Sequence, residues 1–527
     1  MTVVEDARAS TDRPTEQLEE GTTDPIAVAV RLRPRAREGL ERFVSTDPAP
    51  GLELTRIPQV GRAVKSRKFQ FLLILPNQII FWLVIFIGIL GTAYPKLNFA
   101  TAITWFLWFC LVFVMIVVVG RAWCAMCPFG GFAEWIQRRA LWRRAQTRLG
   151  LGRKMPEKLA QYGLLMSVGT FLALTFVEEY FNIAGPGAPI ATSIMVLGIV
   201  SSALVFFLVF ERRTFCRYLC PLSALIGSVG AVGSVTGFRT KDRNRCIECA
   251  TKDCMRGGEE GYGCPWYTWP GSADSNLLCG LCSECYKACP SGNVGLYLQK
   301  PLTSVVAPTR RRPDVAWAIV ILLGLVMYQQ FNATNVYAAM DGWLNRVTHF
   351  PQYPNPIDYF GTIAIVTLAA AGLAKLGSSV LLRRDLAVPV GGTSFISRTS
   401  RFRTFFLPLA YGLIPVTGAD YLARQLPKFF EHVPALVPAV GHLVGAGSTR
   451  SRLYTYSILH APGVVIAQIV VVALGTAAAM WTSWRIAGRE LAPVSKNPEA
   501  TRLATTGLAL AVGIAMAVLY VLMHGAN

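Results

Sequence analysis

The sequence predicts an α-helical protein that crosses a membrane about nine times, with a cysteine-rich module inserted between the fourth and fifth crossings. Three observations lead to this fold class. Of the 527 residues, 53% are hydrophobic and only 16% are charged, whereas roughly a quarter of the residues in a soluble domain are charged. Several apolar runs reach the ~20 residues that a helix needs to cross a bilayer. Eight of the 13 cysteines lie within residues 246–289.

The segment before the first apolar run, residues 1–68, is expected to be a cytoplasmic tail. Residues 1–24 are polar and acidic and lack the apolar core of a signal peptide, so they are interpreted as a disordered tail. Residues 25–68 mix apolar and basic side chains, a pattern that fits an amphipathic helix on the inner leaflet.

The apolar runs that follow are predicted to be membrane-spanning helices. The weakest of them, residues 404–424, contains Pro408, Pro415 and Asp420. Residues 222–237 are apolar but short and rich in Gly and Ser, which favours a re-entrant or interfacial segment over a further span. The predicted spans are residues 70–94, 100–120, 160–181, 191–210, 315–337, 357–382, 404–424, 456–480 and 502–523.

Basic residues predict the orientation of these spans. Lys and Arg cluster in alternate loops, whereas residues 178–190 carry Glu178 and Glu179 and no basic residue. Because cytoplasmic loops are enriched in Lys and Arg, we expect the amino terminus and the cysteine-rich module to lie in the cytoplasm of a bacterium. The carboxy terminus is then expected outside the inner membrane. The net charge of +20 is therefore attributed to topology, and no nucleic-acid partner is expected.

The same pattern divides the chain into four expected domains. Loops on the extracytoplasmic side are short, so no folded domain is expected there. The domains are a cytoplasmic tail, residues 1–68; a four-helix membrane repeat, 69–237; a cytoplasmic module, 238–300; and a C-terminal membrane domain of about five helices, 301–527.

The cysteines of the module have the spacing of a bacterial ferredoxin. From Cys279 to Pro290 the chain reads C-G-L-C-S-E-C-Y-K-A-C-P, a run whose last Cys ligates the second cluster in two-cluster ferredoxins. The upstream set reads C-x2-C-x4-C-x9-C-P, and its inserted residues 255–263 can loop out. Because such spacing in a reducing compartment indicates metal binding, we expect two [4Fe–4S] clusters. One would take Cys246, Cys249, Cys254 and Cys289, and the other Cys279, Cys282, Cys285 and Cys264.

Two further cysteine pairs stand where predicted spans meet the cytoplasm. Each pair follows an aromatic residue and ends in Cys-Pro, which indicates an approximate internal repeat. If the halves pack about a pseudo-twofold axis, the four thiols meet beside Arg121, Arg213 and Arg217, which are expected to lower the thiol pKa values. The thiols could hold a third iron–sulfur cluster or another soft metal, form dithiol couples, or only pack. The four residues are Cys124, Cys127, Cys216 and Cys220.

These motifs resemble the membrane-bound polyferredoxins that serve periplasmic nitrate reductase, nitrous-oxide reductase and cytochrome oxidase assembly. The resemblance covers roughly residues 70–300. It departs from the nitrous-oxide-associated members, which look to have a flavin domain, and from the short nitrate-associated members. The resemblance implies electron transfer across or into the membrane, with a quinol or quinone at one end.

Polar residues near the opposite face complete the set of candidates. His432, His442 and His460 could line a quinone pocket or ligate haem b. Ordinary interfacial histidines are the leading interpretation, and haem b is not expected. An acid within an apolar span, such as Asp420, is a candidate for proton transfer, although its place near the interface allows simple hydration.

Together these features predict an electron-transfer protein that links a cytoplasmic ferredoxin, flavodoxin or dehydrogenase with quinone or a membrane redox partner. The basic residues Arg239, Lys241, Arg243 and Arg245 suit docking of an acidic carrier or contact with membrane lipid. An alternative is an assembly or regulatory factor that reduces a metal such as copper. A transporter carrying an iron–sulfur sensor is a third interpretation, which the scarcity of charge in the spans disfavours.

Overall fold

The computed structural model describes residues 51–141, 149–183, 189–308, 310–350, 354–383, 400–446 and 450–524. Within these residues, 9 helical segments are long and apolar enough to cross a membrane, which confirms the predicted fold class. They are Phe69–Leu90, Phe99–Arg138, Gly163–Tyr180, Pro189–Val209, Pro313–Phe331, Pro356–Leu381, Arg401–Leu443, Ala461–Val494 and Pro498–Met523.

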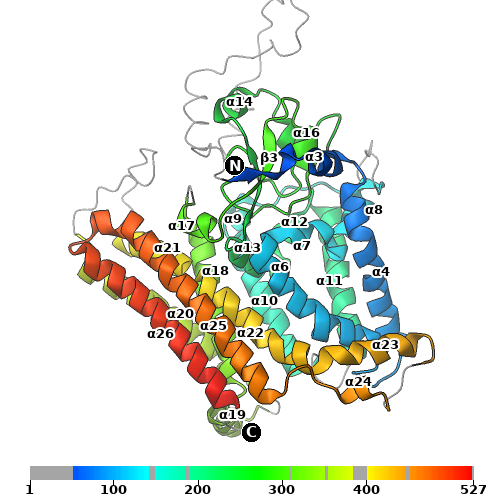
Figure 1. Ribbon diagram of the computed structural model, residues 1–527, viewed down its shortest axis with the longest axis vertical. Coiled ribbons are helices and arrows are strands. Elements are labelled where there is room, and N and C mark those ends of the chain that lie inside the picture. Colours follow the sequence, from blue (N-terminus) through cyan, green and yellow to red (C-terminus); the bar gives the residue numbers. More distant parts are fainter. Residues whose placement is uncertain are drawn as a thin grey trace, which may run out of the picture.

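The N-terminal half of the membrane region consists of four long segments, and short helices cover one end of them (Figure 1). Both Cys-Pro motifs occur at equivalent places, because Pro128 and Pro221 each occupy the first turn of a short helix and a cysteine precedes each. Proline suits this position, where its missing N–H has no partner in the helix. The elements are α4 (Phe69–Leu90), α5 (Phe99–Thr101), η2 (Ala102–Trp108), α6 (Phe109–Val119), η3 (Gly120–Ala122), α7 (Trp123–Met126), α8 (Pro128–Arg138), α9 (Glu157–Ala160), α10 (Gly163–Tyr180), α11 (Pro189–Val209), α12 (Thr214–Tyr218) and α13 (Pro221–Gly230).

The cysteine-rich module lies at the same end and includes a segment from the amino terminus. Its three-stranded antiparallel sheet has the order β1-β3-β2, and Leu52 pairs with Leu298. Gly51 permits this pairing, since a Cβ there would lie 2.0 Å from the Leu298 carbonyl oxygen. The segment expected to be a separate tail thus contributes β1 and α3 to the module. The elements are β1 (Leu52–Glu53), η1 (Leu54–Arg56), α3 (Pro58–Lys65), β2 (Val235–Thr240), α14 (Arg243–Glu248), α15 (Asp253–Arg256), α16 (Glu284–Ala288) and β3 (Val294–Leu298).

The C-terminal half forms a second helical layer beside the first (Figure 1). The segment expected to be the weak span 404–424 is two helices, α21 and α22, which meet at Leu413 because Pro415 begins the second. Helix α22 packs against α6 and η2 of the N-terminal half. The elements are α17 (Thr303–Val306), α18 (Pro313–Phe331), α19 (Asn335–Thr348), α20 (Pro356–Leu381), α21 (Arg401–Gly412), α22 (Ile414–His432), η4 (Val433–Ala435), α23 (Leu436–Leu443), α24 (Arg452–Thr455), α25 (Ala461–Ile486), η5 (Ala487–Leu491), η6 (Ala492–Val494) and α26 (Pro498–His524).

The module and the end of α26 lie at opposite ends of the molecule (Figure 1). Helix α13, within the segment expected to be re-entrant, is a 10-residue helix that is too short to cross a bilayer. After α13 the chain turns directly into β2, so this helix carries the chain from the membrane layer into the module.

Candidate iron–sulfur centres and the adjoining cavity

The first four thiols of the module gather around helices α14 and α15. The thiol of Cys254 interacts electrostatically with those of Cys246, Cys249 and Cys289. The backbone amide of Asn293 donates a hydrogen bond to the Cys289 sulfur at 3.3 Å, a contact that also stabilises a ligating thiolate. The structure therefore brings together the cysteines that ferredoxin spacing assigns to one cluster.

The second group of thiols lies closer to the membrane layer. The thiol of Cys285 interacts with those of Cys264, Cys279 and Cys282, and the amide of Thr268 donates to the Cys264 sulfur at 3.3 Å. Burial raises the pKa of the Cys264 thiol to about 11. Bound iron would reverse this effect because a coordinating thiol is deprotonated. Sulfur donors with amide contacts fit a four-iron cluster.

The spacing within these groups distinguishes a cluster from a single ion. In the part of the chain that the structure describes, no three His, Cys, Asp or Glu side chains gather closely enough to hold one metal ion. A cubane does not require such convergence, because each of its four thiolates binds a different iron. Groups of four thiols meet this requirement of a cluster.

The two Cys-Pro motifs also meet in the structure. The thiol of Cys216 interacts electrostatically with those of Cys220, Cys127 and Cys124. Cys124 lies in α7 and Cys216 in α12, while Cys127 and Cys220 immediately precede α8 and α13. We call these four residues the thiol quartet. The internal repeat of the sequence thus places four soft donors at one site.

The arginines around the thiol quartet have other partners. Arg213 is buried, donates to Glu134 Oε2 at 2.9 and 2.5 Å, and donates to the Cys124 carbonyl oxygen at 2.9 Å. Arg121 donates to the carbonyl oxygen of Ser223 at 2.8 Å. Burial outweighs these cations and raises the pKa of the Cys220 thiol to about 12. The charge of Arg121 does lower the pKa of Cys220, as expected, but desolvation outweighs this effect.

The thiol quartet is joined to the second thiol group of the module. The Cys279 thiol interacts electrostatically with Cys124, and the Cys282 thiol interacts with Arg213. Arg212 donates to the carbonyl oxygen of Cys264 at 2.7 Å, which ties α12 to the module. The three groups of thiols therefore form a series from the module into the membrane layer.

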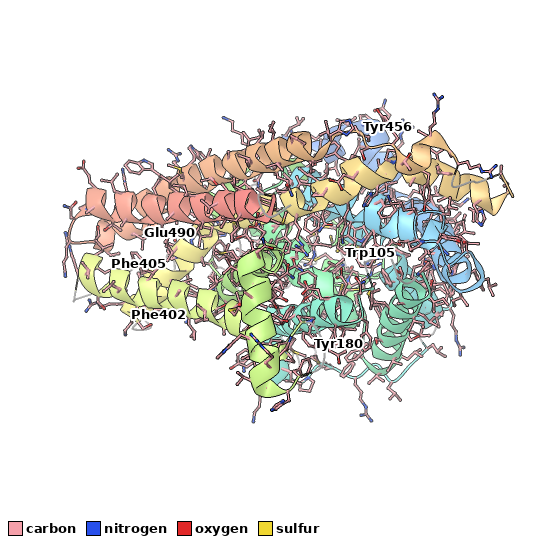
Figure 2. The ribbon with its side chains drawn as sticks, turned by 90° about the horizontal axis from the view of Figure 1, so that it is seen from below. Trp105, Tyr180, Phe402, Phe405, Tyr456 and Glu490 are labelled. Carbon is pink, nitrogen blue, oxygen red and sulfur yellow. The ribbon has the colours of Figure 1, made fainter. Side chains whose placement is uncertain are left out.

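A cavity of about 190 Å³ begins at the thiol quartet and extends between the N-terminal helices. Its walls are mostly aromatic and aliphatic, and they include Trp105, which donates to Thr192 Oγ1 at 3.0 Å. The view from below shows Trp105 among the N-terminal helices, away from Phe402 and Glu490 in the C-terminal half (Figure 2). The cavity also touches all four cysteines of the thiol quartet.

The opposite end of the cavity is charged. Glu178, Arg424 and Lys428 line it, and the Lys428 ammonium lies 5.1 Å from the centre of the Trp105 ring. Ser167 of α10 lies beside the thiol quartet, because its hydroxyl donates a hydrogen bond to the Cys220 carbonyl oxygen at 2.6 Å. Glu178 follows on the same helix about three turns later, so the two ends are separated by roughly 16 Å along the helix axis at 1.5 Å per residue.

The sequence identified some of these residues and missed others. Glu178 entered the sequence analysis only through the charge of its loop, and no function was predicted for Arg424 or Lys428. Their spacing of four residues in an otherwise apolar run was the available signal, because cations inside a span commonly face a cavity or partner.

The three candidate histidines do not line the cavity. No histidine lines the cavity within the described residues. His432 packs edge-on against Phe106 with ring centres 5.1 Å apart, and His442 and His460 are exposed. A quinone contact through these three side chains is therefore not supported by the geometry.

Comparison with known proteins shows a similarity to ferredoxin-type proteins. A 4Fe-4S binding domain matches residues 101–148 and 192–235, the two segments that contain the thiol quartet. The chain is 30% identical over 140 residues to the ferredoxin-type protein NapH of Escherichia coli and 30% identical over 146 residues to the methylamine utilization ferredoxin-type protein MauN of Paracoccus denitrificans. The chain is thus similar to these two ferredoxin-type proteins over 25% of its length.

The chain matches less than half of the length of NapH and of MauN. The matches cover 25% of this chain in each case, and 44% of NapH and 47% of MauN. An uncharacterized protein, MJ0750 of Methanocaldococcus jannaschii, is 26% identical over 190 residues, which are 34% of this chain and 73% of that protein. No solved structure matches the chain significantly.

Proposed function

We propose that this ferredoxin-type protein carries electrons between a cytoplasmic one-electron carrier and the quinone pool. One observation carries the proposal: a single cavity has the thiol quartet at one end and Glu178, Arg424 and Lys428 at the other. A quinone needs both an electron-transfer partner and proton-exchanging groups, because its reduction takes up two electrons and two protons.

The module would hold two [4Fe–4S] clusters, one in each of its two thiol groups, and the thiol quartet would hold a third centre. When bound, such clusters supply one-electron transfer. The match of the 4Fe-4S binding domain to the segments around the thiol quartet supports a metal role for these four thiols. The chain itself excludes water from them, since Trp266 is almost fully buried beside the cavity.

The cavity walls suit a flat, largely apolar ring with polar oxygens at its edge. Trp105, Trp108 and Phe109 provide aromatic faces, and Trp105 and Phe109 are stacked with ring centres 5.2 Å apart. Arg424 and Lys428 can donate hydrogen bonds to a quinone oxygen. Small-molecule pockets combine apolar walls with a few polar groups in this way.

The face of the module that contacts the carrier is less basic than the sequence indicated. Arg239 is only 6% exposed, and Lys241 pairs with Glu53 at 2.8 Å. Docking of an acidic carrier would therefore depend more on Arg245, whose side chain is 69% exposed. We propose the cytoplasm for this face on the basis of the charge pattern of the loops.

The first experiment is the iron and acid-labile sulfide content of anaerobically purified protein, with EPR of the reduced sample. We expect about twelve irons per chain if the thiol quartet holds a cubane, and about eight if it does not. Cys220→Ser should remove the third centre. The matched control is Cys110→Ser, which alters a buried thiol in the same half of the protein but outside all three groups.

Quinone chemistry is then tested with the wild-type protein in nanodiscs containing decylubiquinone. Reduction of the quinone by cluster-reduced protein, and its loss on substitution of Trp105 by Ala, would support the proposal. Copper(II) reduction without quinone reduction would contradict it and favour the metal-reductase alternative, because soft thiolates also suit Cu(I).

A further inference from the structure

The charged end of the cavity continues into the C-terminal helices. Arg424 of α22 interacts electrostatically with Glu178 and Glu179 of α10, and it also interacts with Asp420 one turn earlier on its own helix. Its guanidinium donates to the carbonyl oxygen of Gln329 in α18 at 2.5 Å. Arg424 therefore connects a residue that lines the cavity with a carboxylate that does not.

Asp420 is the most enclosed member of this group. It is fully buried, and side chains of two other helices contact it. Gln330 of α18 donates to its Oδ1 atom, and Tyr520 of α26 donates to its carbonyl oxygen at 3.4 Å. Gln468 of α25 is buried nearby and donates to the carbonyl oxygen of Ala423 at 3.2 Å. Within the described residues, the Asp420 Oδ2 atom has no hydrogen-bond partner.

Glu179 has a similar environment. The Tyr328 hydroxyl donates to its Oε2 atom at 2.9 Å, and the Asn332 amide donates at 3.3 Å. The Tyr328 hydroxyl also lies 3.3 Å from that of Tyr337. Among the residues that the structure describes, no group hydrogen-bonds to Glu179 Oε1. An unpartnered carboxylate oxygen in a buried site is a position where a proton can reside.

The charges of this group do not balance. Three carboxylates, those of Glu178, Glu179 and Asp420, face two cations, Arg424 and Lys428. Beyond Lys428 lies His432, with Lys96 and Glu431 around it. Ionised groups within a membrane are costly unless they are paired. One proton shared among the three carboxylates would make the group neutral.

We propose that Glu178 and Glu179 of α10 and Asp420 of α22 share one exchangeable proton, and that this group forms the proton-exchanging side of the quinone cavity. This inference rests on the proposed quinone chemistry. When a quinone takes up two electrons from the thiol side, it takes up two protons; one comes from the shared group and the other from water at the same face. The group then regains its proton from water, and quinol oxidation reverses these transfers.

The test is infrared spectroscopy of the full-length protein in nanodiscs at neutral pH, which detects the C=O stretching band of a protonated carboxylic acid. We expect the wild-type protein to show a band that Asp420→Asn removes or shifts. Gln330→Met should shift the same band while keeping the acid, because it removes the donor to Asp420 Oδ1. The matched control, Asp314→Asn, should leave the band unchanged, because Asp314 pairs with Arg312 at 2.6 Å and lies outside the group of three carboxylates.

The same proteins are then compared for proton uptake during reduction of decylubiquinone. Because a positioned acid or base contributes on the order of a hundredfold to proton transfer, Glu178→Gln should slow uptake by about that factor. The more remote Asp420→Asn should slow it about tenfold.

An infrared band that none of the variants at Glu178, Gln330 and Asp420 alters would overturn the inference even if quinone is reduced. Absence of quinone reduction by the wild-type protein would instead contradict the proposed function, and the infrared band would still decide the protonation of the group.

Discussion

The two halves of the membrane region differ in their chemistry. All 13 cysteines precede residue 290, whereas the five histidines follow residue 348. The N-terminal half surrounds its thiols with arginines such as Arg213, which is paired with Glu134, while the C-terminal half buries Asp420, whose Oδ2 atom has no hydrogen-bond partner among the described residues. On the proposed route the N-terminal half would hold the redox centres rigidly, and Asp420 would exchange protons together with Glu178 and Glu179 of α10.

Two ion pairs provide the strongest test of this rigidity. Glu134 pairs with Arg213, and their side chains are 5% and 1% exposed, whereas Glu490 of the C-terminal half pairs with Arg311 and is 31% exposed. Glu134→Gln should lower the free energy of unfolding by about 3–5 kcal/mol, because it leaves a buried arginine unpaired. Glu490→Gln should lower it by about 1 kcal/mol or less. Thermal unfolding in detergent measures both, and equal effects would show that the halves are equally rigid.

Two glycines provide the next comparison. In the module, a Cβ on Gly280 would lie 2.2 Å from Trp266 Nε1, whereas one on Gly361 of α20 would meet no atom within 4 Å among the described residues. Gly280→Ala should destabilise the protein by about 1–3 kcal/mol through overpacking and should alter the EPR spectrum of the adjoining centre. Gly361→Ala should stabilise the helix by about 0.4–1 kcal/mol. An unchanged EPR spectrum and stability for Gly280→Ala would mean that Trp266 moves freely.

The smallest predicted effect concerns pH at the edge of the module. Burial opposes ionisation of Glu53, but hydrogen bonds from Lys241, Thr55 and Arg56 together with the charge of Lys241 leave its pKa below the usual value of 4.5. A depressed pKa stabilises the folded state above the unfolded-state pKa, and this contribution is lost as the pH falls through the folded-state value. Hydrogen exchange of residues 52–56 should therefore accelerate below about pH 4.5. Glu53→Gln should remove the pH dependence, and its persistence would contradict this assignment.

The sequence predicted the features that depend on local composition or spacing. Hydropathy located the nine spans among the described residues because most of them are continuous apolar runs, and the weakest is divided into α21 and α22. Ferredoxin spacing predicted two groups of four thiols, and the thiols within each group interact electrostatically. Strand β1 was missed because two residues carry no periodic signal. The cavity was also missed, since its walls come from several helices that are distant in sequence. The net rise in the pKa of Cys220 was missed because sequence proximity shows neither that Arg213 is paired with Glu134 nor how deeply the thiols are buried.

The separation between the two ends of the cavity has an electrical consequence. On the proposed route, electrons reach the cavity from the thiol quartet, and protons reach it from the face near Glu178. The two ends are separated by roughly 16 Å, about half of the ~30 Å hydrocarbon layer. An electron that travels this distance crosses a corresponding part of the membrane potential, and a full crossing changes its energy by about 2.3 kcal/mol per 100 mV. Turnover on the proposed route would therefore generate or consume a transmembrane voltage, and its rate would respond to the voltage already present.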